Sequence, residues 1–325
     1  MVTGCGYLLI GLIGAILIDV MLGDPPNRIH PVSWIGTLIS ILIPKIKAYD
    51  VINEKLRGVI FVIMLVASIG AVTQLLVLAC LHLIGIVAAI VLTTLILKTT
   101  LAIKGMEQHA IEITDALERG DLKSAQQNLS LIVRRPTDQL SRRYVLSATI
   151  ECIGESTVDG IVAPLFYYSL LGPTGALTYR IINTLDSMVG YRDEYYKNIG
   201  WMSAKLDTIS NFIPARITSF LMVISSQLAG ADWKNCLQIL RSDHNRTLSP
   251  NAGYPMAAMA GALRIKLEKI GHYSLGENQE PLTTAKCRKA LSIMKLTTIL
   301  FSVGLSIPLL LILCLVGWWK LLFGF

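Results

Sequence analysis

The sequence predicts an all-α, polytopic integral membrane protein with about five to six transmembrane helices and large helical cytoplasmic loops. The 325 residues are 53% hydrophobic and only 16% charged. Their mean hydropathy is +0.58, which is high for a soluble domain of this length. Several long runs carry no charged side chain, and the basic residues gather between these runs.

The apolar runs give the expected spans, because about 20 apolar residues at 1.5 Å per residue match a hydrocarbon core roughly 30 Å thick. The spans are expected at residues 3–22, 59–79, 83–97, 160–179, 208–230 and 296–317. The fourth contains Pro164 and Pro173, and the fifth contains Arg216. A segment broken by proline can be buried in protein instead of crossing. The number of spans therefore stays open between five and six.

The polar segments between the spans belong to one membrane-embedded unit, residues 1–325, because no internal repeat is visible. They cover residues 23–58, 98–159, 180–207 and 231–295. Most Lys and Arg fall in the first, second and fourth, which the positive-inside rule places in the cytoplasm. The net charge of +7 comes without a basic stripe interleaved with aromatics, so we expect no nucleic-acid partner. The six cysteines have no CxxC spacing, and we expect small buried hydrophobes without a zinc site or disulfide framework.

Three soluble helices are expected in these segments. Apolar residues recur with a period near 3.6 over residues 98–119, where Gly120 ends the pattern. A second helix should run from Asp121 to a point before Pro136. A third, rich in small residues, is expected over residues 256–270.

Three carboxylates, Glu151, Glu155 and Asp159, are spaced four residues apart, so a helix places them on one face. Neighbouring like charges repel unless a cation neutralises them. That cation is either Mg²⁺, which prefers oxygen ligands, or a nearby arginine. A salt-bridged structural face is the alternative. The nearby arginines are Arg134, Arg135, Arg142 and Arg143, with Asp138 among them.

A second polar group lies within ten residues, where Asn183, Asp186, Tyr191 and Arg192 surround Gly190. Amide, carboxylate, hydroxyl and guanidinium groups together are more than a connector needs, although a solvated loop also fits.

The remaining candidate groups lie at turns. Asp243 beside His244 suits proton transfer or metal binding, and a solvated histidine is the alternative. The turn at residues 249–253 precedes a helix start, where backbone N–H groups can hold an anion. Near the N-terminus, Asp24 and His30 lie in a turn fixed by three prolines.

Taken together, these segments resemble the adenosylcobinamide-phosphate synthase family of cobalamin biosynthesis, known as CobD or CbiB. The matching pieces occur in family order over about residues 15–275, and that ordered set is far more specific than any single piece. They are residues 22–25 with 30–32 and 35–36, 135–138 with 140–142, 151–159, 183–191, 213–216 and 243–255.

The resemblance implies an amide ligase that uses ATP and Mg²⁺ to join adenosylcobyric acid to (R)-1-amino-2-propanol or its O-phosphate. Its implied surroundings are the cell membrane, with the site on the cytoplasmic face, and other late corrinoid-pathway enzymes as partners. Glu151, Glu155 and Asp159 are the expected Mg²⁺ ligands, and Asp186, Asp243 or His244 is the expected base. The expected substrate- and nucleotide-binding residues are Arg135, Asp138, Arg142, Arg143, Asn183, Tyr191, Arg192, Arg216, Asn251, Tyr254, Asp24 and His30.

Two other classes of protein stay open from the residues alone. Polar residues beside spans often mark the path of a transporter or channel. Against that class, the clearest runs, residues 58–97 and 296–319, contain no ionisable residue except His82. A signalling or regulatory membrane protein of the same fold is the other alternative.

Overall fold

The computed structural model describes residues 2–26, 28, 30–47, 50–191 and 193–324. The described chain is helical apart from one two-stranded sheet. It divides into two compact units: unit 1 is Met1–Leu101, Ala163–Ser210 and Leu305–Phe325, and unit 2 is Ala102–Val162 and Asn211–Gly304. That residues 1–325 act as one catalytic unit stays a prediction.

The predicted fold class is confirmed. Four helical stretches of the described chain are long and apolar enough to cross a membrane, or five if α9 and α10 form one broken span. The segments Gly6–Leu22 and Pro31–Ile46 are shorter apolar helices. The four long stretches are Val51–Ile84, Ile86–Glu118, Arg142–Val189 and Thr284–Leu315.

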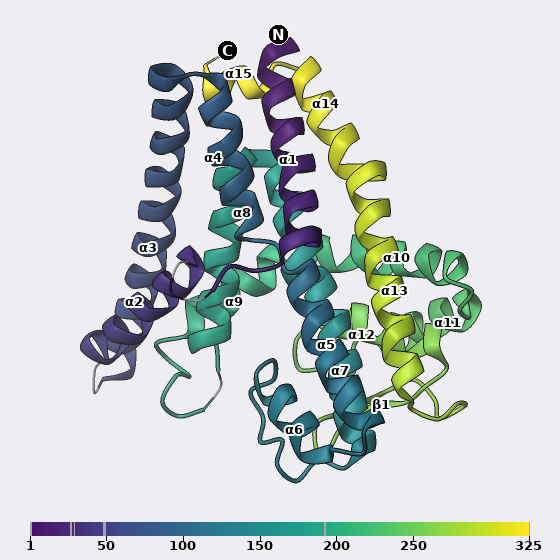
Figure 1. The fold of residues 1–325 in the computed structure, drawn as a ribbon. Coiled ribbons are helices and arrows are strands. Elements are labelled where there is room, and N and C mark those ends of the chain that lie inside the picture. The colour runs from purple at the N-terminus through teal and green to yellow at the C-terminus, as the bar shows by residue number, and fades with distance from the viewer. Residues whose placement is uncertain (1, 27, 29, 48–49, 192, 325) are drawn as a thin grey trace. The chain divides into compact units, whose positions relative to one another are not determined.

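Unit 1 contains the helices near both ends of the chain. Helix α4 packs against α1 and α8, while α3 packs against α8, and both termini lie at the same end of this unit (Figure 1). Its elements are α1 (Val2–Leu22), α2 (Pro31–Ile46), α3 (Val51–Ala79), the π-helix η2 (Cys80–Ile84), α4 (Ile86–Lys98), α8 (Ala163–Val189), α9 (Trp201–Ser210), α14 (Ile307–Leu315) and α15 (Trp318–Phe323).

Helix α8 is broken in the middle, as its prolines and glycines lead one to expect. Gly172 has φ +67° and Pro173 follows it, so the helical hydrogen-bond pattern is interrupted at this point. A Cβ on Gly172 would lie 2.9 Å from the ring of Phe323. The expected span at 160–179 is therefore part of a longer helical stretch with a kink.

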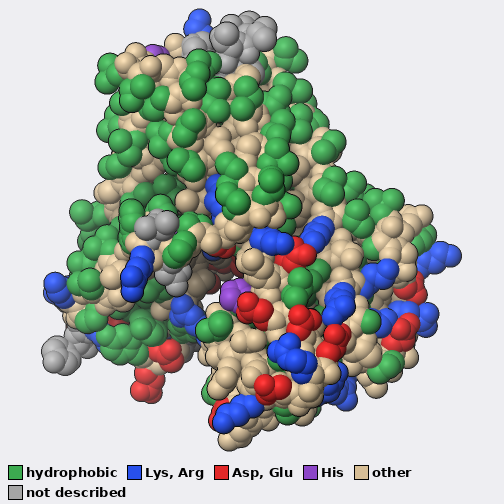
Figure 2. Space-filling model, viewed as in Figure 1, with side chains coloured by type: hydrophobic (Ala, Val, Ile, Leu, Met, Phe, Trp, Pro, Cys, Tyr) green, Lys and Arg blue, Asp and Glu red, His purple; other side chains and the backbone are tan. Residues whose placement is uncertain are grey.

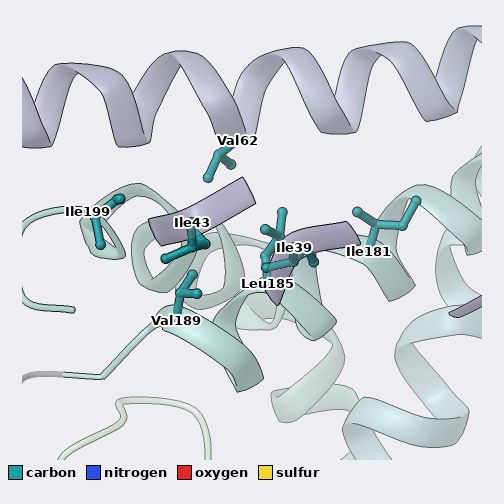
Figure 3. Close-up of a cluster of buried hydrophobic side chains, with 7 residues drawn as sticks. All are labelled: Ile39, Ile43, Val62, Ile181, Leu185, Val189 and Ile199. Carbon is teal, nitrogen blue, oxygen red and sulfur yellow. The ribbon is translucent and has the colours of Figure 1, made fainter. Parts of the chain in front are cut away.

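The core of unit 1 joins α2, α3, α8 and α9 (Figure 3). Gly58 allows α3 to approach closely, because a Cβ there would lie 2.2 Å from the carbonyl oxygen of Ile199. Helices α2 and α3 are thereby held against the second half of α8. The cluster consists of Ile39, Ile43, Val62, Ile181, Leu185, Val189 and Ile199.

Unit 2 is built around α12, whose residues are all buried except the half-buried Tyr254. Helices α7, α10, α11 and α13 all pack on it. Its small residues permit this: a Cβ on Gly261 would lie 2.6 Å from the carbonyl oxygen of Asn235 on α11. The elements of unit 2 are α5 (Ile103–Glu118), α6 (Leu122–Ser130), α7 (Arg142–Thr157), the π-helix η3 (Val158–Val162), α10 (Phe212–Leu228), α11 (Trp233–Asp243), α12 (Gly253–Leu263), β1 (Leu267–Lys269), β2 (Tyr273–Leu275) and α13 (Thr284–Phe301). The π-helix η4 (Ser302–Ser306) lies where the chain passes from unit 2 to unit 1.

Two of the expected soluble helices form, and the third is shorter than predicted. Helix α6 begins at Leu122 and is capped by Asp121, whose side chain accepts a hydrogen bond from the backbone N–H of Ser124 at 3.0 Å. Helix α12 ends at Leu263, because Arg264 adopts the left-handed conformation with φ +59°. The chain then forms the antiparallel hairpin β1–β2 where the sequence predicted helix up to residue 270.

The surfaces of the two units differ in composition (Figure 2). In unit 1, hydrophobic side chains cover the visible faces of α1 and α3, as expected for lipid contact, and Ile13 and Met64 are 45% and 62% exposed. In unit 2, charged side chains of both signs gather on the visible face. One cysteine prediction is wrong, because Cys314 on α14 is disulfide-bonded.

Candidate functional site

Glu151, near the middle of α7, is the centre of a buried polar cluster in unit 2. Its carboxylate accepts hydrogen bonds from Ser147 Oγ at 2.7 Å and from the hydroxyl of Tyr273 at 2.9 Å, and Arg135 Nη2 lies 3.4 Å away. Ser147 also accepts the backbone N–H of Glu268 at 2.8 Å. Helix α7, the hairpin and the loop before α7 therefore meet at one carboxylate.

The electrostatics of this cluster keep the Tyr273 hydroxyl protonated. Burial raises the pKa of Tyr273 well above its ordinary value, and the negative charges of Glu151 and Glu155 raise it further. The hydroxyl is thus a fixed donor to Glu151. Tyr273 was not among the residues predicted for the site.

The expected trio of Mg²⁺ ligands does not form a ready-made metal site. Within the described chain, no three His, Cys, Asp or Glu side chains are grouped to hold a metal ion. Two causes are visible: Glu151 is turned toward Arg135 and Tyr273, and α7 ends at Thr157. Asp159 lies in η3, whose wider turn breaks the four-residue register. Glu155 and Asp159 are half-buried.

The other predicted charged residues near Arg135, one in the loop before α7 and two at the start of α7, face outward. Asp138, Arg142 and Arg143 are exposed, and Arg142 donates to the carbonyl oxygen of Leu117 at the end of α5 at 2.5 Å. Only Arg135 of the predicted phosphate-binding arginines on this loop reaches the Glu151 cluster.

A second cluster in unit 2 brings together four predicted residues from three helix ends. The guanidinium carbon of Arg216 lies 3.5 Å from the ring centroid of Phe212 and 4.4 Å from that of Tyr254. Arg216 Nη1 also donates to Asn251 Oδ1 at 3.3 Å. The ring of His244 lies 4.5 Å from that of Tyr254. We name Arg216, His244, Asn251 and Tyr254 the Arg216 cluster.

Glycine at position 253 makes this arrangement possible, because a Cβ there would lie 2.0 Å from the carbonyl oxygen of His244. The start of α12 can therefore lie directly against the end of α11, with Tyr254 beside His244. In His244, Nδ1 lies 2.9 Å from the carbonyl oxygen of Leu240. Since a carbonyl only accepts, Nδ1 carries the proton, and Nε2 has no bonding partner among the described residues.

Asp243 is separate from this cluster although it is adjacent in sequence. Asp243 is 3% exposed, and its carboxylate accepts hydrogen bonds from Ser242, Arg246 and the backbone N–H of Gly276. These bonds tie the end of α11 to the residue after β2. The geometry is that of a structural tie.

Unit 1 has its own polar cluster where α1 and α4 end. Lys98 Nζ lies 3.0 Å from Asp19 Oδ1 and 2.8 Å from Asp24 Oδ1. Asp19 is completely buried, whereas the Asp24 side chain is 36% exposed. Lys98 thus neutralises a buried charge and holds the turn that contains Asp24.

His30 lies within electrostatic range of Lys98, Asp24 and Arg180. Burial lowers the pKa of His30. The positive charges of Arg180 and Lys98 also lower this pKa, whereas the negative charge of Asp24 raises it. Arg180 Nη1 lies 3.4 Å from Asn183 Oδ1, and Asn183 Nδ2 lies 3.4 Å from Asp207 Oδ1. Among the described residues, the buried Nε of Arg180 has no hydrogen-bond partner.

The rest of the predicted group around Gly190 lies at the end of α8. A Cβ on Gly190 would lie 2.0 Å from the carboxylate of Asp186, so glycine is required beside this side chain. The hydroxyl of Tyr191 donates to the carbonyl oxygen of Ser187 at 2.8 Å. Arg192 lies outside the described residues.

Several residues of these clusters were missed because their partners are distant in sequence. Lys98 meets Asp19 across 79 positions, and Tyr273 meets Glu151 across 122. A signal existed for Lys98, since it ends a charge-free run and a lysine there needs a counter-ion. Tyr273 has no comparable signal, because it lies in a hairpin that the sequence did not predict.

These features define a polytopic α-helical membrane protein with buried carboxylate and guanidinium clusters at helix ends. The chain belongs to the family described as CobD/Cbib protein, whose model matches residues 12–299. This membership assigns it a role in cobalamin biosynthesis. No solved structure matches the chain.

Curated relatives agree over most of the chain. It is 37% identical to the probable cobalamin biosynthesis protein CobD of Methanothermobacter thermautotrophicus over 293 residues, covering 90% of this chain and 95% of that protein. The corresponding protein of Thermoplasma volcanium is 37% identical, and the match covers 94% of this chain and 98% of that protein. The cobalamin biosynthesis protein CobD of Pelobacter propionicus is 40% identical, with 78% of each chain covered.

Proposed function

We propose that this protein is a ligase that uses ATP and Mg²⁺ to join a carboxylate of adenosylcobyric acid to the amine of (R)-1-amino-2-propanol or its O-phosphate. The family supplies the pathway, and the Arg216 cluster is the observation that favours this chemistry. In this cluster the Arg216 guanidinium and the His244 imidazole both contact the ring of Tyr254, and no hydrogen bond of the described residues uses His244 Nε2.

The reaction needs activation, because a carboxylate does not condense with an amine in water. Transfer of the γ-phosphoryl group of ATP to the carboxylate gives an acyl phosphate and ADP. The amine nitrogen then attacks the acyl carbon: the C–N bond forms, the C–O bond to phosphate breaks, and inorganic phosphate leaves. The ammonium form must first lose a proton to a base.

We assign the base to His244 and not to Asp243 or Asp186. The lone pair on His244 Nε2 is available, while the hydrogen bond from Nδ1 fixes the tautomer and the ring. The oxygens of Asp243 are already occupied by three donors. Asp186 is confined against Gly190.

Arg216 suits the binding of a phosphate or carboxylate group. Its stacking on Phe212 and Tyr254 holds the plane of the guanidinium, and a planar guanidinium binds such anions through two parallel hydrogen bonds. Arg180, with its unbonded Nε, is the corresponding candidate in unit 1.

The residues present fit a Mg²⁺ ion that is bound together with nucleotide phosphates. Such an ion usually takes only one or two protein carboxylates, so the absence of a three-carboxylate group among the described residues is compatible with it. Glu155 and Asp159 are the proposed ligands, and Glu151 orients Arg135. When bound, the ion would neutralise charge on the transferring phosphoryl group.

The proposed location is the cell membrane with the site on the cytoplasmic face, and other late corrinoid-pathway enzymes are the proposed partners. The test is an assay of the purified protein in lipid with ATP, Mg²⁺, adenosylcobyric acid and either amine. ADP and the amide should form only when all components are present. Absence of ATP consumption under these conditions would remove the proposal.

A further inference from the structure

A cleft of about 310 Å³ lies between α5 and α13 in unit 2, outside the clusters described above. Its floor is apolar and its rim carries charges of both signs. It is lined by Glu107, Ile111, Arg288, Leu291, Ser292 and Lys295.

The rim is a ladder of ion pairs between the two helices. At one end Lys295 Nζ lies 2.5 Å from Glu107 Oε1. At the other, Arg288 Nη2 lies 2.9 Å from Glu118 and 3.4 Å from Asp115. The Arg288 and Lys295 side chains are 54% and 44% exposed, so these pairs contribute little to stability and can exchange partners.

The cleft lies beside the point where a charge-free run of a candidate membrane span begins. Lys295 is the last charged residue before the charge-free run 296–319, which belongs to a candidate membrane span. One and two helical turns further along α13 and η4 are Ile299 and Val303, which are 57% and 61% exposed. An apolar stripe therefore continues from the cleft toward the hydrocarbon core.

The charged residues that line the cleft favour a ligand that carries both a negative and a positive group. A ligand with only negative charge meets Glu107, and one with only positive charge meets Arg288 and Lys295. A group with both a phosphate and a primary ammonium satisfies the two sides: the phosphate replaces a carboxylate beside Arg288 and Lys295, and the ammonium donates to Glu107.

We propose that the α5–α13 cleft binds a phospholipid whose headgroup carries a phosphate and a primary ammonium, as in phosphatidylethanolamine, with an acyl chain along Ile299 and Val303. The site is independent of the proposed ligase chemistry. It gives the enzyme a contact through which membrane composition acts on the packing of α5 against α13.

The test is native mass spectrometry of the purified full chain with phosphatidylethanolamine, phosphatidylcholine or phosphatidylglycerol of identical acyl chains. Wild type should bind phosphatidylethanolamine about fivefold more tightly than the other two, as expected for one headgroup contact of this kind. Choline cannot donate a hydrogen bond to Glu107, and glycerol carries no cation. Equal binding of the three lipids would overturn the proposal.

Two variants locate the site. Ser292→Phe fills the cleft and should abolish the preference, whereas Ser130→Phe should keep it. Ser130 is a matched control, because both serines are exposed and donate to a carbonyl of their own helix. Glu107→Leu, which has no acceptor for the ammonium, should remove the preference for ethanolamine over choline while the lipids still bind, a change that simple unfolding would not produce. Retained preference in Ser292→Phe or Glu107→Leu, or displacement of lipid by soluble aminopropanol phosphate, would contradict a lipid site here.

Discussion

The hydroxyl of Tyr273 donates to the carboxylate of Glu151 across 2.9 Å, and this bond joins the β1–β2 hairpin to α7. The raised pKa of Tyr273 keeps its hydroxyl protonated, so the donor is constant at physiological pH. Glu151 is thereby held toward Arg135.

Replacing Tyr273 with Phe should destabilise unit 2 by about 1–3 kcal/mol, because the buried Glu151 loses one of its donors. Ligase activity should fall as well, since Arg135 loses its fixed partner. Thermal unfolding and the amide assay measure both effects. Tyr195→Phe is the control, because Tyr195 is exposed. An unchanged melting temperature for Tyr273→Phe would disprove the structural role of the bond.

The two neighbouring glutamates should respond differently to replacement. Glu151→Gln should lower the melting temperature, because Arg135 then loses its ion pair. Glu155→Gln should fold normally but need a higher Mg²⁺ concentration for half-maximal ligase activity. A Mg²⁺ titration of both purified variants makes the comparison. An unshifted Mg²⁺ requirement for Glu155→Gln would eliminate Glu155 as a ligand.

Lys98→Met should be among the most damaging single changes in unit 1. It leaves the fully buried Asp19 without its counter-ion, which typically costs about 3–5 kcal/mol. Asp19→Asn should be milder, because Lys98 keeps Asp24. The double variant Asp19→Asn/Lys98→Met should recover part of the loss. Denaturant unfolding in lipid-like detergent ranks the three, and equal losses in all of them would be inconsistent with a neutralising role for Lys98.

His30 should make stability depend on pH. Its folded-state pKa is lowered, so the folded protein binds the proton less tightly than the unfolded chain. The contribution is therefore present above the unfolded pKa, about 6.5, and is lost as the pH falls below it toward the folded pKa. His30→Asn removes the titration but keeps a side chain able to cap α2 as His30 does. Melting temperatures from pH 7.5 to 5 should fall more steeply for wild type than for this variant, and parallel curves would contradict the assignment.

The helices of the membrane region were predictable because hydropathy and helix length are local properties. The expected span 59–79 lies entirely in α3, whereas 83–97 and 296–317 are helical except at Gly85 and at residues 316–317. The break near Pro173 follows from backbone chemistry. The hairpin was not predictable in this way, because nothing in the helix expected up to residue 270 indicates that Arg264 leaves the helical conformation.

In the candidate site, too, contacts between residues close in sequence were predictable and contacts between distant residues were not. Neighbours in sequence, such as Asn251 and Tyr254, were correctly grouped, since a short turn keeps them together. The grouping of Asp243 with His244 was wrong, because consecutive residues at a helix end point in different directions. Partners such as Lys98 for Asp19 depend on helix packing, which spacing along the chain does not encode.

The central claim is that the protein activates a carboxylate as an acyl phosphate, and the fate of the carboxylate oxygen tests it most directly. Adenosylcobyric acid labelled with ¹⁸O in the reacting carboxylate should be incubated with ATP, Mg²⁺, the amine and the purified protein. The account predicts one ¹⁸O atom in inorganic phosphate for each amide formed, with ADP as the other product. Label in AMP, or amide formation without label in phosphate, would contradict it.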